Sequence, residues 1–291
     1  MKIENEFLRV EANLLGGSLT SIFDKKKKEE VLYQIEKDSW QGQDVCIFPF
    51  VARLEDKTYT YNGKEYSLRN HGLCRYYEFE VVEQKESSLI LLLKSNEETL
   101  KEYPFAFEFY VTYRLEDKKL IVMYTIVNKS KKVMPFGVGA HPAFKVNAEI
   151  KDGVFSTNGN FVQFEKPLQL TRICFDSKGE MVVGKEDFGV KKEIEIDKKL
   201  FDEYKTLCVS GDGISDVTLF RKDGYKIKFH YDNINYFVLW SFPQNGAYVA
   251  IEPWMSLPDY ANADKDIMKK ETLIHLPQDE TYLFSYSLTI E

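Results

Sequence analysis

The chain has 291 residues, with 39 Lys and Arg against 46 Asp and Glu, which gives a formal net charge of −7. This balance argues against a nucleic-acid partner, because phosphate contacts need clustered basic side chains. The basic run Lys25 to Lys28 is followed at once by Glu29 and Glu30, which is typical of a solvated turn. Hydrophobic residues make up 44% of the chain, enough for a large core, and we expect a single domain over residues 1–291.

No apolar run approaches the ~20 residues that cross a bilayer, so we expect no membrane partner. The first ten residues, MKIENEFLRV, contain no apolar segment of the signal-peptide kind, which predicts a cytoplasmic location. Four scattered cysteines without a CxxC pair are then expected to be free thiols. Neither a disulfide framework nor a structural zinc site is indicated.

Alternating apolar and polar residues, the pattern of a strand with one buried face, dominate the chain. The alternation runs from Phe105 to Leu115, stops at Asp117-Lys118 and resumes from Leu120 to Ile126, which predicts an antiparallel hairpin. Further strands are predicted at residues 77–81, 89–93, 225–231, 236–241, 247–252 and 281–290.

Turn signals recur between these segments, and helix signals are sparse. Asp197 to Tyr204 could form two helical turns after an Asp cap, and Asp264 to Lys270 another short helix. Many short strands with few helices predict an all-β sandwich or barrel. The tight-turn dipeptides are Asn62-Gly63, Asp152-Gly153, Asn158-Gly159, Asp223-Gly224 and Asn245-Gly246.

Two histidines and one glutamate stand out as candidates for chemistry. His71 lies in a polar loop bounded by glycine, and His141 lies in a stretch of small residues where backbone can approach a ligand closely. Glu252 ends an apolar strand, where a buried carboxylate would need a partner. His141 and Glu252 each directly precede a proline, which restricts their backbone to extended conformations. The simpler interpretation of each X-Pro pair is a strand end.

Other interpretations are weaker. His230 and His275 are expected to be a solvated strand residue and a structural residue. A metal site formed by His71, His141 and Glu252 is conceivable, but no local His spacing supports it, and we predict no metal. No phosphate loop or G-x-S-x-G elbow is present. Trp40 and Trp254 could fill the core or lie beside the polar motifs.

Five segments occur in order along nearly the whole chain: FPFVARL (48–54), YNGKEY (61–66), HGLCR (71–75), GAHPAF (139–144) and IEPW (251–254) with Asp259 following. Together they resemble the aldose 1-epimerase (galactose mutarotase) family. The resemblance is closer to its short bacterial branch, which includes lactose-operon proteins and borders on the hexose-6-phosphate epimerases.

The resemblance implies a large antiparallel two-sheet β-sandwich with a sugar on its concave face. It implies that His141 is the general acid and Glu252 the general base, and that Arg53 and His71 hydrogen-bond the sugar. Ring opening and reclosure would interconvert the α and β anomers with no cofactor. A carboxylate and an imidazole are suited to these roles near neutral pH.

Some positions depart from the family pattern. Ala52 precedes the arginine, and Met255-Ser256-Leu257 follows the tryptophan. The sugar-binding aspartate of the family is not located securely, although Asp202 lies in a plausible region.

Three functions therefore stay open. The first is a 1-epimerase of free hexoses. The second is a hexose-6-phosphate 1-epimerase, with Arg53 and Arg75 as phosphate ligands unless Arg75 forms a surface salt bridge. The third is a non-catalytic carbohydrate-binding protein on the same fold. The expected partner is a small sugar, bound by a monomer or homodimer, with Trp254 near the site.

Overall fold

The computed structural model describes residues 1–37, 39–147, 149–151, 154–156, 159–241 and 247–291. Most of them form antiparallel strands, and one continuous sheet holds fifteen of these strands. Its order is β5-β13-β23-β22-β19-β17-β20-β21-β25-β11-β10-β9-β8, with β14 beside β23 and β18 beside β17. A second sheet, β1-β2-β3-β4, contributes its apolar side chains to the same core.

The bounds in the large sheet are β5 (Cys46–Ile47), β8 (Glu80–Gln84), β9 (Ser88–Lys94), β10 (Phe107–Glu116), β11 (Lys119–Asn128), β13 (Gly139–Ala140), β14 (Ala143–Lys145), β17 (Phe161–Phe175), β18 (Val182–Glu195), β19 (Thr206–Ser210), β20 (Asp216–Phe220), β21 (Lys226–Tyr231), β22 (Tyr236–Trp240), β23 (Tyr248–Trp254) and β25 (Thr281–Ile290). The second sheet comprises β1 (Lys2–Glu4), β2 (Leu8–Ala12), β3 (Leu19–Asp24) and β4 (Glu29–Glu30). Three small pairs join β6 (Thr58–Tyr61) to β7 (Lys64–Ser67), β12 (Met134–Phe136) to β24 (Ile274–Leu276), and β15 (Glu149–Lys151) to β16 (Val154–Ser156). The α-helices are α1 (Glu97–Glu102) and α2 (Lys198–Tyr204), and the 3₁₀ turns are Glu55–Lys57, Cys74–Tyr76 and Ile267–Lys269.

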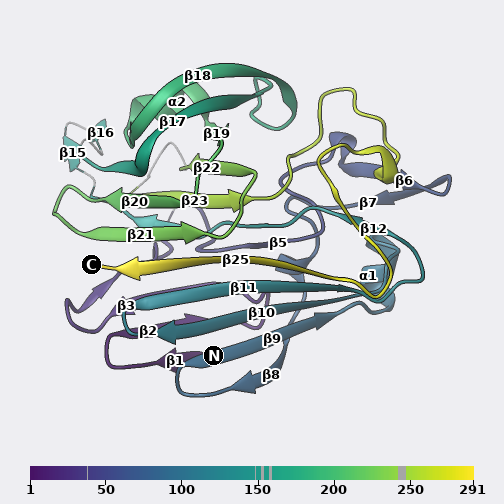
Figure 1. Cartoon of the computed structure of the whole chain (residues 1–291), viewed down its shortest axis with the longest axis horizontal. Helices are drawn as coiled ribbons and strands as arrows, with labels where there is room; N and C mark the ends of the chain where they lie inside the picture. Colours follow the sequence, from purple (N-terminus) through teal and green to yellow (C-terminus); the bar gives the residue numbers. More distant parts are fainter. Residues whose placement is uncertain (38, 148, 152–153, 157–158, 242–246) are drawn as a thin grey trace.

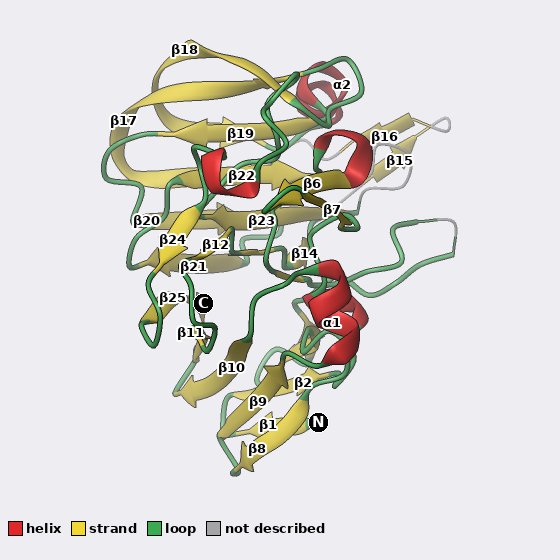
Figure 2. Ribbon diagram, turned by 90° about the vertical axis from the view of Figure 1, so that its right-hand side faces the viewer, coloured by secondary structure: helices red, strands yellow, loops and turns green. Residues whose placement is uncertain are grey.

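The large sheet coils into the layers of a β-sandwich. In Figure 1, β25, β11, β10 and β9 lie side by side in one half of the molecule, and β20 to β23 with the long β17–β18 hairpin form the other. Figure 2, turned by 90°, shows β1 and β2 beside β8 to β10. The chain thus forms the antiparallel β-sandwich that the resemblance implied, with few short helices.

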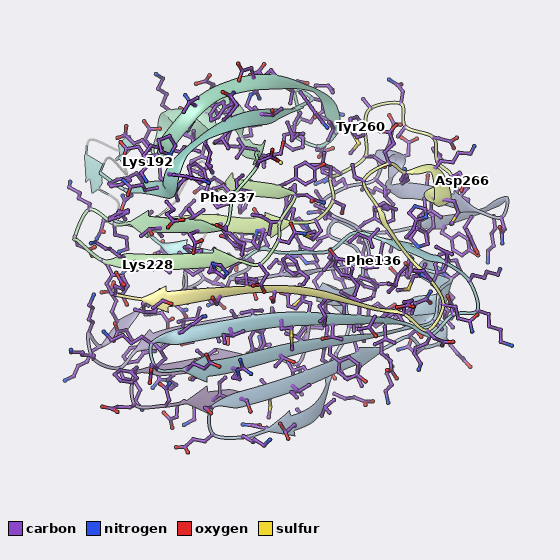
Figure 3. The ribbon with its side chains drawn as sticks, in the orientation of Figure 1. Phe136, Lys192, Lys228, Phe237, Tyr260 and Asp266 are labelled. Carbon is purple, nitrogen blue, oxygen red and sulfur yellow. The ribbon has the colours of Figure 1, made fainter. Side chains whose placement is uncertain are left out.

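The β10–β11 hairpin shows how the sequence pattern builds this core. Phe107 pairs with Asn128 and Glu116 with Lys119, so the ladder is continuous along both strands. Every second residue of each strand is buried, which fixes the register, because a slip by one residue would expose the whole apolar face. Of the residues labelled in Figure 3, Phe136 and Phe237 are buried, and Lys228 on β21 is exposed.

The strand predicted at residues 77–81 is confirmed in part, since residues 80 and 81 begin β8 (Glu80–Gln84). Residues 77–79 pair instead with the segment at 14–16, through Gly16 N to Tyr77 O and Phe79 N to Leu14 O, and the strand beside β9 begins only at Glu80. Helix α1 was not predicted, and its cap is Asn96, whose side chain accepts from the backbone N–H of Glu98 and Thr99.

The remaining local predictions are largely confirmed. Asp197 caps α2 by accepting from the N–H of Leu200, and the segment at 264–270 contains only a 3₁₀ turn. Asn62-Gly63 connects β6 to β7, and Asp223-Gly224 lies between β20 and β21. Asp152-Gly153, Asn158 and Asn245-Gly246 lie outside the described residues. All four cysteines are free, and among the described residues no helix is long and apolar enough to span a bilayer.

Candidate active site

The six residues predicted for the site line one cavity of about 400 Å³. The cavity lies over the ends of β17, β19, β22 and β23, and loops from distant parts of the chain form its walls. The sequence motifs that carry chemistry are therefore brought together by the fold. The six residues are Arg53, His71, Arg75, His141, Glu252 and Trp254.

His141 is held by the backbone on both sides. It follows β13, which pairs with β5 and touches β23, and its own N–H donates to the carbonyl of Val45 at 3.1 Å. A Cβ atom at Gly139 would come within 2.9 Å of the Pro253 carbonyl oxygen, so only glycine allows β13 and β23 to approach this closely. The imidazole is 5% exposed, at the cavity wall.

Glu252 faces the cavity from β23, a strand whose residues are all buried. Its Oε1 lies 3.2 Å from Nε2 of His141, and its Oε2 accepts a hydrogen bond of 3.0 Å from the indole Nε1 of Trp254. Because an indole N–H can only donate, Oε2 is an acceptor. A proton on this carboxyl group must therefore lie on Oε1, facing His141.

Burial controls the protonation of this pair. It raises the pKa of Glu252 well above 4.5, an effect opposed by the Trp254 hydrogen bond and reinforced by the nearby Asp44 carboxylate. Burial also lowers the pKa of His141 from 6.5 to about 3. Both shifts favour uncharged groups at neutral pH, so the carboxyl proton lies between Oε1 and Nε2, and the ring proton of neutral His141 is on Nδ1.

His71 presents a defined hydrogen-bond donor to the cavity. Its N–H donates to the Ala52 carbonyl at 2.7 Å, and its ring Nδ1 accepts from the Ala52 N–H at 3.2 Å. Burial and the neighbouring His141 lower its pKa well below 6.5, so the ring is neutral. Since Nδ1 is an acceptor, the ring proton must be on Nε2.

The backbone of this loop needs special residues. His71 has φ of 62° and Gly72 has φ of 78°, both in the left-handed region. A Cβ atom at Gly72 would lie 2.3 Å from the Phe48 carbonyl oxygen, which explains the glycine in the HGLCR motif. Ala52, which departs from the family pattern, is the residue that fixes the His71 tautomer through its N–H.

The cavity rim is predominantly basic. Arg53 forms an ion pair of 2.9 Å with Glu180, which lies in the turn between β17 and β18, and Lys178 lines the cavity from the same turn. Arg75 lines the cavity too, and no carboxylate among the described residues forms an ion pair with it. The alternative prediction, in which a surface salt bridge occupies Arg75, is therefore not what the described structure contains.

Asp259, the last residue of the matching motifs, holds in place the loop that carries Arg53. Its N–H donates to the Arg53 carbonyl at 3.0 Å, and its Oδ2 accepts from the Glu55 N–H at 3.0 Å. Its Oδ1 lies 2.5 Å from Nζ of Lys270, and both side chains are buried. This pair ties the loop carrying Arg53 to the 3₁₀ turn at Ile267–Lys269.

Aromatic side chains also line the cavity. The ring centroids of Trp40 and His141 are 4.8 Å apart, and those of Trp240 and His141 are 5.4 Å apart. Trp40 and Trp254 both line the cavity, and Trp254 is at the same time a buried member of a hydrophobic cluster against which Trp40 packs.

Several lining residues were not identified from the sequence. Trp240 ends β22, and Lys178 and Glu180 lie in the β17–β18 turn, none of them within a recognisable motif. Asn70 and Thr206 also line the cavity, and Asn70 directly precedes the HGLCR motif, which was a usable signal. Thr206 and Trp240 come together because β19 pairs with β22.

Other candidates lie elsewhere. Asp202 is exposed on α2 and pairs with Lys198, and it does not line the cavity. His230 is exposed and contacts Asp216, and His275 is exposed on β24. In the part of the chain that the structure describes, no group of three or more His, Cys, Asp or Glu side chains is placed to hold a metal ion.

Comparison with known proteins gives one consistent result. The family model described as aldose 1-epimerase matches residues 1–289. The plasmid-encoded protein LacX of Lactococcus lactis subsp. lactis is 28% identical over 304 aligned residues, covering 100% of this chain and 99% of LacX. A galactose mutarotase related enzyme from Lactobacillus acidophilus superposes with a TM-score of 0.92 at 29% identity, covering 100% of this chain and 97% of the other.

A galactose mutarotase-like protein from Lactobacillus casei gives a TM-score of 0.91 at 26% identity, covering 100% and 99% of the two chains. The motifs, the fold and the cavity thus agree with a family match over almost the whole length, and the chain belongs to the aldose 1-epimerase family.

Proposed function

We propose that the protein is a 1-epimerase that interconverts the α and β anomers of a hexose by acid–base ring opening and reclosure. The observation that carries this proposal is the contact of 3.2 Å between Nε2 of His141 and Oε1 of Glu252 at the wall of the cavity. A sugar hydroxyl and the ring oxygen attached to the same carbon are close enough together to meet two such groups. The family match and the mutarotase-like relatives support this reaction type.

In the proposed cycle, Glu252 as carboxylate takes the proton of the anomeric hydroxyl while His141 as imidazolium protonates the ring oxygen. The bond from C1 to the ring oxygen breaks, and the open-chain aldehyde forms. After C1 rotates, neutral His141 takes the proton back from the former ring oxygen as it attacks C1. Protonated Glu252 then returns a proton to the carbonyl oxygen, and the pair regains its starting state.

The cycle uses two states of the pair, which differ only by one proton moved across 3.2 Å. Burial favours the uncharged state, which is the state that recloses the ring, so ring opening requires that the shared proton first move from Oε1 of Glu252 to Nε2 of His141. His71, through its Nε2–H, is proposed to donate to a sugar oxygen, and the guanidinium of Arg53 to bind a second one. Trp254 is proposed to orient Glu252 and thereby contribute to substrate binding.

A phosphorylated hexose is the second candidate substrate. It is favoured by Arg75, which lines the cavity without an ion-pair partner among the described residues, and by Lys178 on the same rim. A guanidinium can bind a phosphate through two parallel hydrogen bonds. A non-catalytic sugar-binding protein is the remaining alternative, although a binder would not need the His141–Glu252 contact.

The test is the decay of optical rotation after α-glucose, α-galactose or glucose 6-phosphate is dissolved with and without the protein. The proposal expects faster decay than the spontaneous rate with at least one hexose. Arg75→Ala should impair only the phosphorylated sugar if that is the substrate, and equal effects on both kinds of sugar would count against a phosphate role. Binding without acceleration would favour the non-catalytic alternative. We retain the cytoplasm as the proposed location, in keeping with four free cysteines.

A further inference from the structure

The imidazole of His141 has one polar anchor. Its Nε2 contacts Glu252, but its buried Nδ1 has no hydrogen-bond partner among the described residues. Functional histidines are commonly oriented by a hydrogen bond at the second nitrogen, which fixes the tautomer and the ring plane. With one anchor only, the ring could turn about that contact. Its orientation must therefore depend on what packs against its faces.

Three rings provide that packing: the imidazole of His71, edge to face at a centroid distance of 5.3 Å, and two indole rings from distant parts of the chain. Trp40 lies 4.8 Å from the imidazole centroid with the planes inclined by 35°, so it covers one face. Trp240 approaches at 5.4 Å and 68°, edge to face. The two indoles meet each other at 5.4 Å and 80°, forming a corner in which the imidazole lies.

The indole of Trp40 is itself held in place. The ring of Tyr248 lies 6.0 Å from it, and the ring of Tyr33 lies 4.2 Å from that of Tyr248, with the planes tilted by 33°. On another side lies Gly42, where an added Cβ atom would come within 2.5 Å of the ring carbon Cζ2 of Trp40. The position of this indole thus depends on the missing side chain at residue 42.

We propose that Trp40 is a positioning residue that fixes the ring plane of His141 for proton transfer, in the place of a hydrogen bond at Nδ1. This inference rests on the proposed function for its kinetic consequence, but not for its structural one. A misplaced acid–base group slows the chemical step, and shifts of about 1 Å can cost about 10²-fold. The ground-state affinity for sugar need not change.

The experiment compares Trp40→Leu, Trp40→Phe and Gly42→Ala in two measurements. The first is kcat and KM for the hexose that the wild type turns over. The second is the ¹⁵N spectrum of the His141 ring in the free protein, assigned with His141→Asn, which reports the tautomer and whether it is unique. Phe220→Leu, which disrupts the Phe161–Phe220 stack at 4.8 Å, is the matched control, because neither of its rings lines the cavity.

We expect one protonation pattern for His141 in the wild type and a mixed or exchange-broadened one in Trp40→Leu. In the same variant kcat should fall by about tenfold to 10²-fold with little change in KM. Gly42→Ala should move both readouts in the same direction, because its Cβ displaces the indole. Trp40→Phe should retain most of the wild-type behaviour, and Phe220→Leu should change stability only.

The inference is overturned if Trp40→Leu raises KM alone and leaves kcat and the ring spectrum unchanged, since Trp40 would then serve only to bind sugar. It is also overturned if Trp40→Leu and Gly42→Ala both match the wild type. If Trp40→Leu does not fold, Gly42→Ala and Trp40→Phe decide. If the wild type acts on no sugar, the proposed function fails, and the ring spectrum still tests whether Trp40 positions His141.

Discussion

Replacing Glu252 by Gln removes the group that transfers the proton but leaves the packing of the site in place. The Gln side chain has nearly the same shape, and its carbonyl oxygen can still accept from Trp254 Nε1, now 3.0 Å from Oε2. Its amide can donate to His141 Nε2 across the present 3.2 Å. What is lost is the ability to take and return a proton. The fold should therefore persist while catalysis fails.

The expected loss can be estimated from the role of the group. A positioned general base typically contributes about 10²–10⁴-fold, which is about 3–5 kcal/mol of transition-state stabilisation. Initial rates of anomer conversion, with the spontaneous rate subtracted, should fall by that factor. Glu186→Gln, a change at an exposed β18 carboxylate that does not line the cavity, should leave the rate unchanged.

Stability provides an independent readout with a defined sign. Folding raises the pKa of Glu252 above its ordinary value of 4.5, so the folded state holds this proton more tightly than the unfolded state. This group contributes its whole stabilising free energy below about pH 4.5, and the contribution is lost as pH rises toward the pKa of Glu252 in the folded state. Glu252→Gln removes this slope, so its stability relative to wild type should rise with pH in urea denaturation. The reasoning is refuted if Glu252→Gln keeps the wild-type rate, or if it is less stable than the wild type at pH 8.

Three further changes test other parts of the account. His71→Asn keeps a residue that tolerates positive φ and an acceptor for the Ala52 N–H, but it removes the Nε2–H donor. In steady-state kinetics KM should therefore rise about tenfold, while kcat changes less. Lys270→Met leaves buried Asp259 without its cation and should lower the free energy of unfolding by about 3 kcal/mol, a loss that Asp259→Asn in the same protein should partly reverse. Burial raises the pKa of Asp44 from 3.8 to about 6, so the wild type loses stability as pH rises from 3.8 to 6. Relative to wild type, the free energy of unfolding of Asp44→Asn should therefore be higher by up to about 3 kcal/mol above pH 6 and equal below pH 3.8. Each of the last two is checked by denaturation, and no change in stability would contradict it.

The parts of the fold that were predictable are those with a local physical signature. β10 and β11 alternate buried and half-buried or exposed residues along their whole length, so period and register follow from the sequence. The β17–β18 hairpin was not predicted, because Pro167 and several register shifts interrupt any alternation. Its turn carries part of the cavity rim.

The residues of the site likewise fall into those with a local sequence signal and those without one. His141, Glu252 and His71 became candidates through their local context, a following proline or glycine, and their proposed roles came from the family resemblance. Trp240 and Glu180 had no such signal: Trp240 enters the cavity wall where β22 pairs with β19, and Glu180 lies in the turn of the unpredicted β17–β18 hairpin. Local patterns therefore find residues with restricted backbone, and the folded structure is needed for those that the topology delivers.

The central claim is that His141 and Glu252 exchange protons with the anomeric centre of a hexose. Saturation transfer between the α- and β-anomeric protons at equilibrium tests it directly, with wild type, His141→Asn and Glu252→Gln compared at equal concentration. The account predicts transfer above the spontaneous rate with wild type on glucose, galactose or glucose 6-phosphate, and transfer reduced by about 10²-fold or more in both variants. Transfer that persists in both variants would contradict it, as would its absence with wild type on all three sugars.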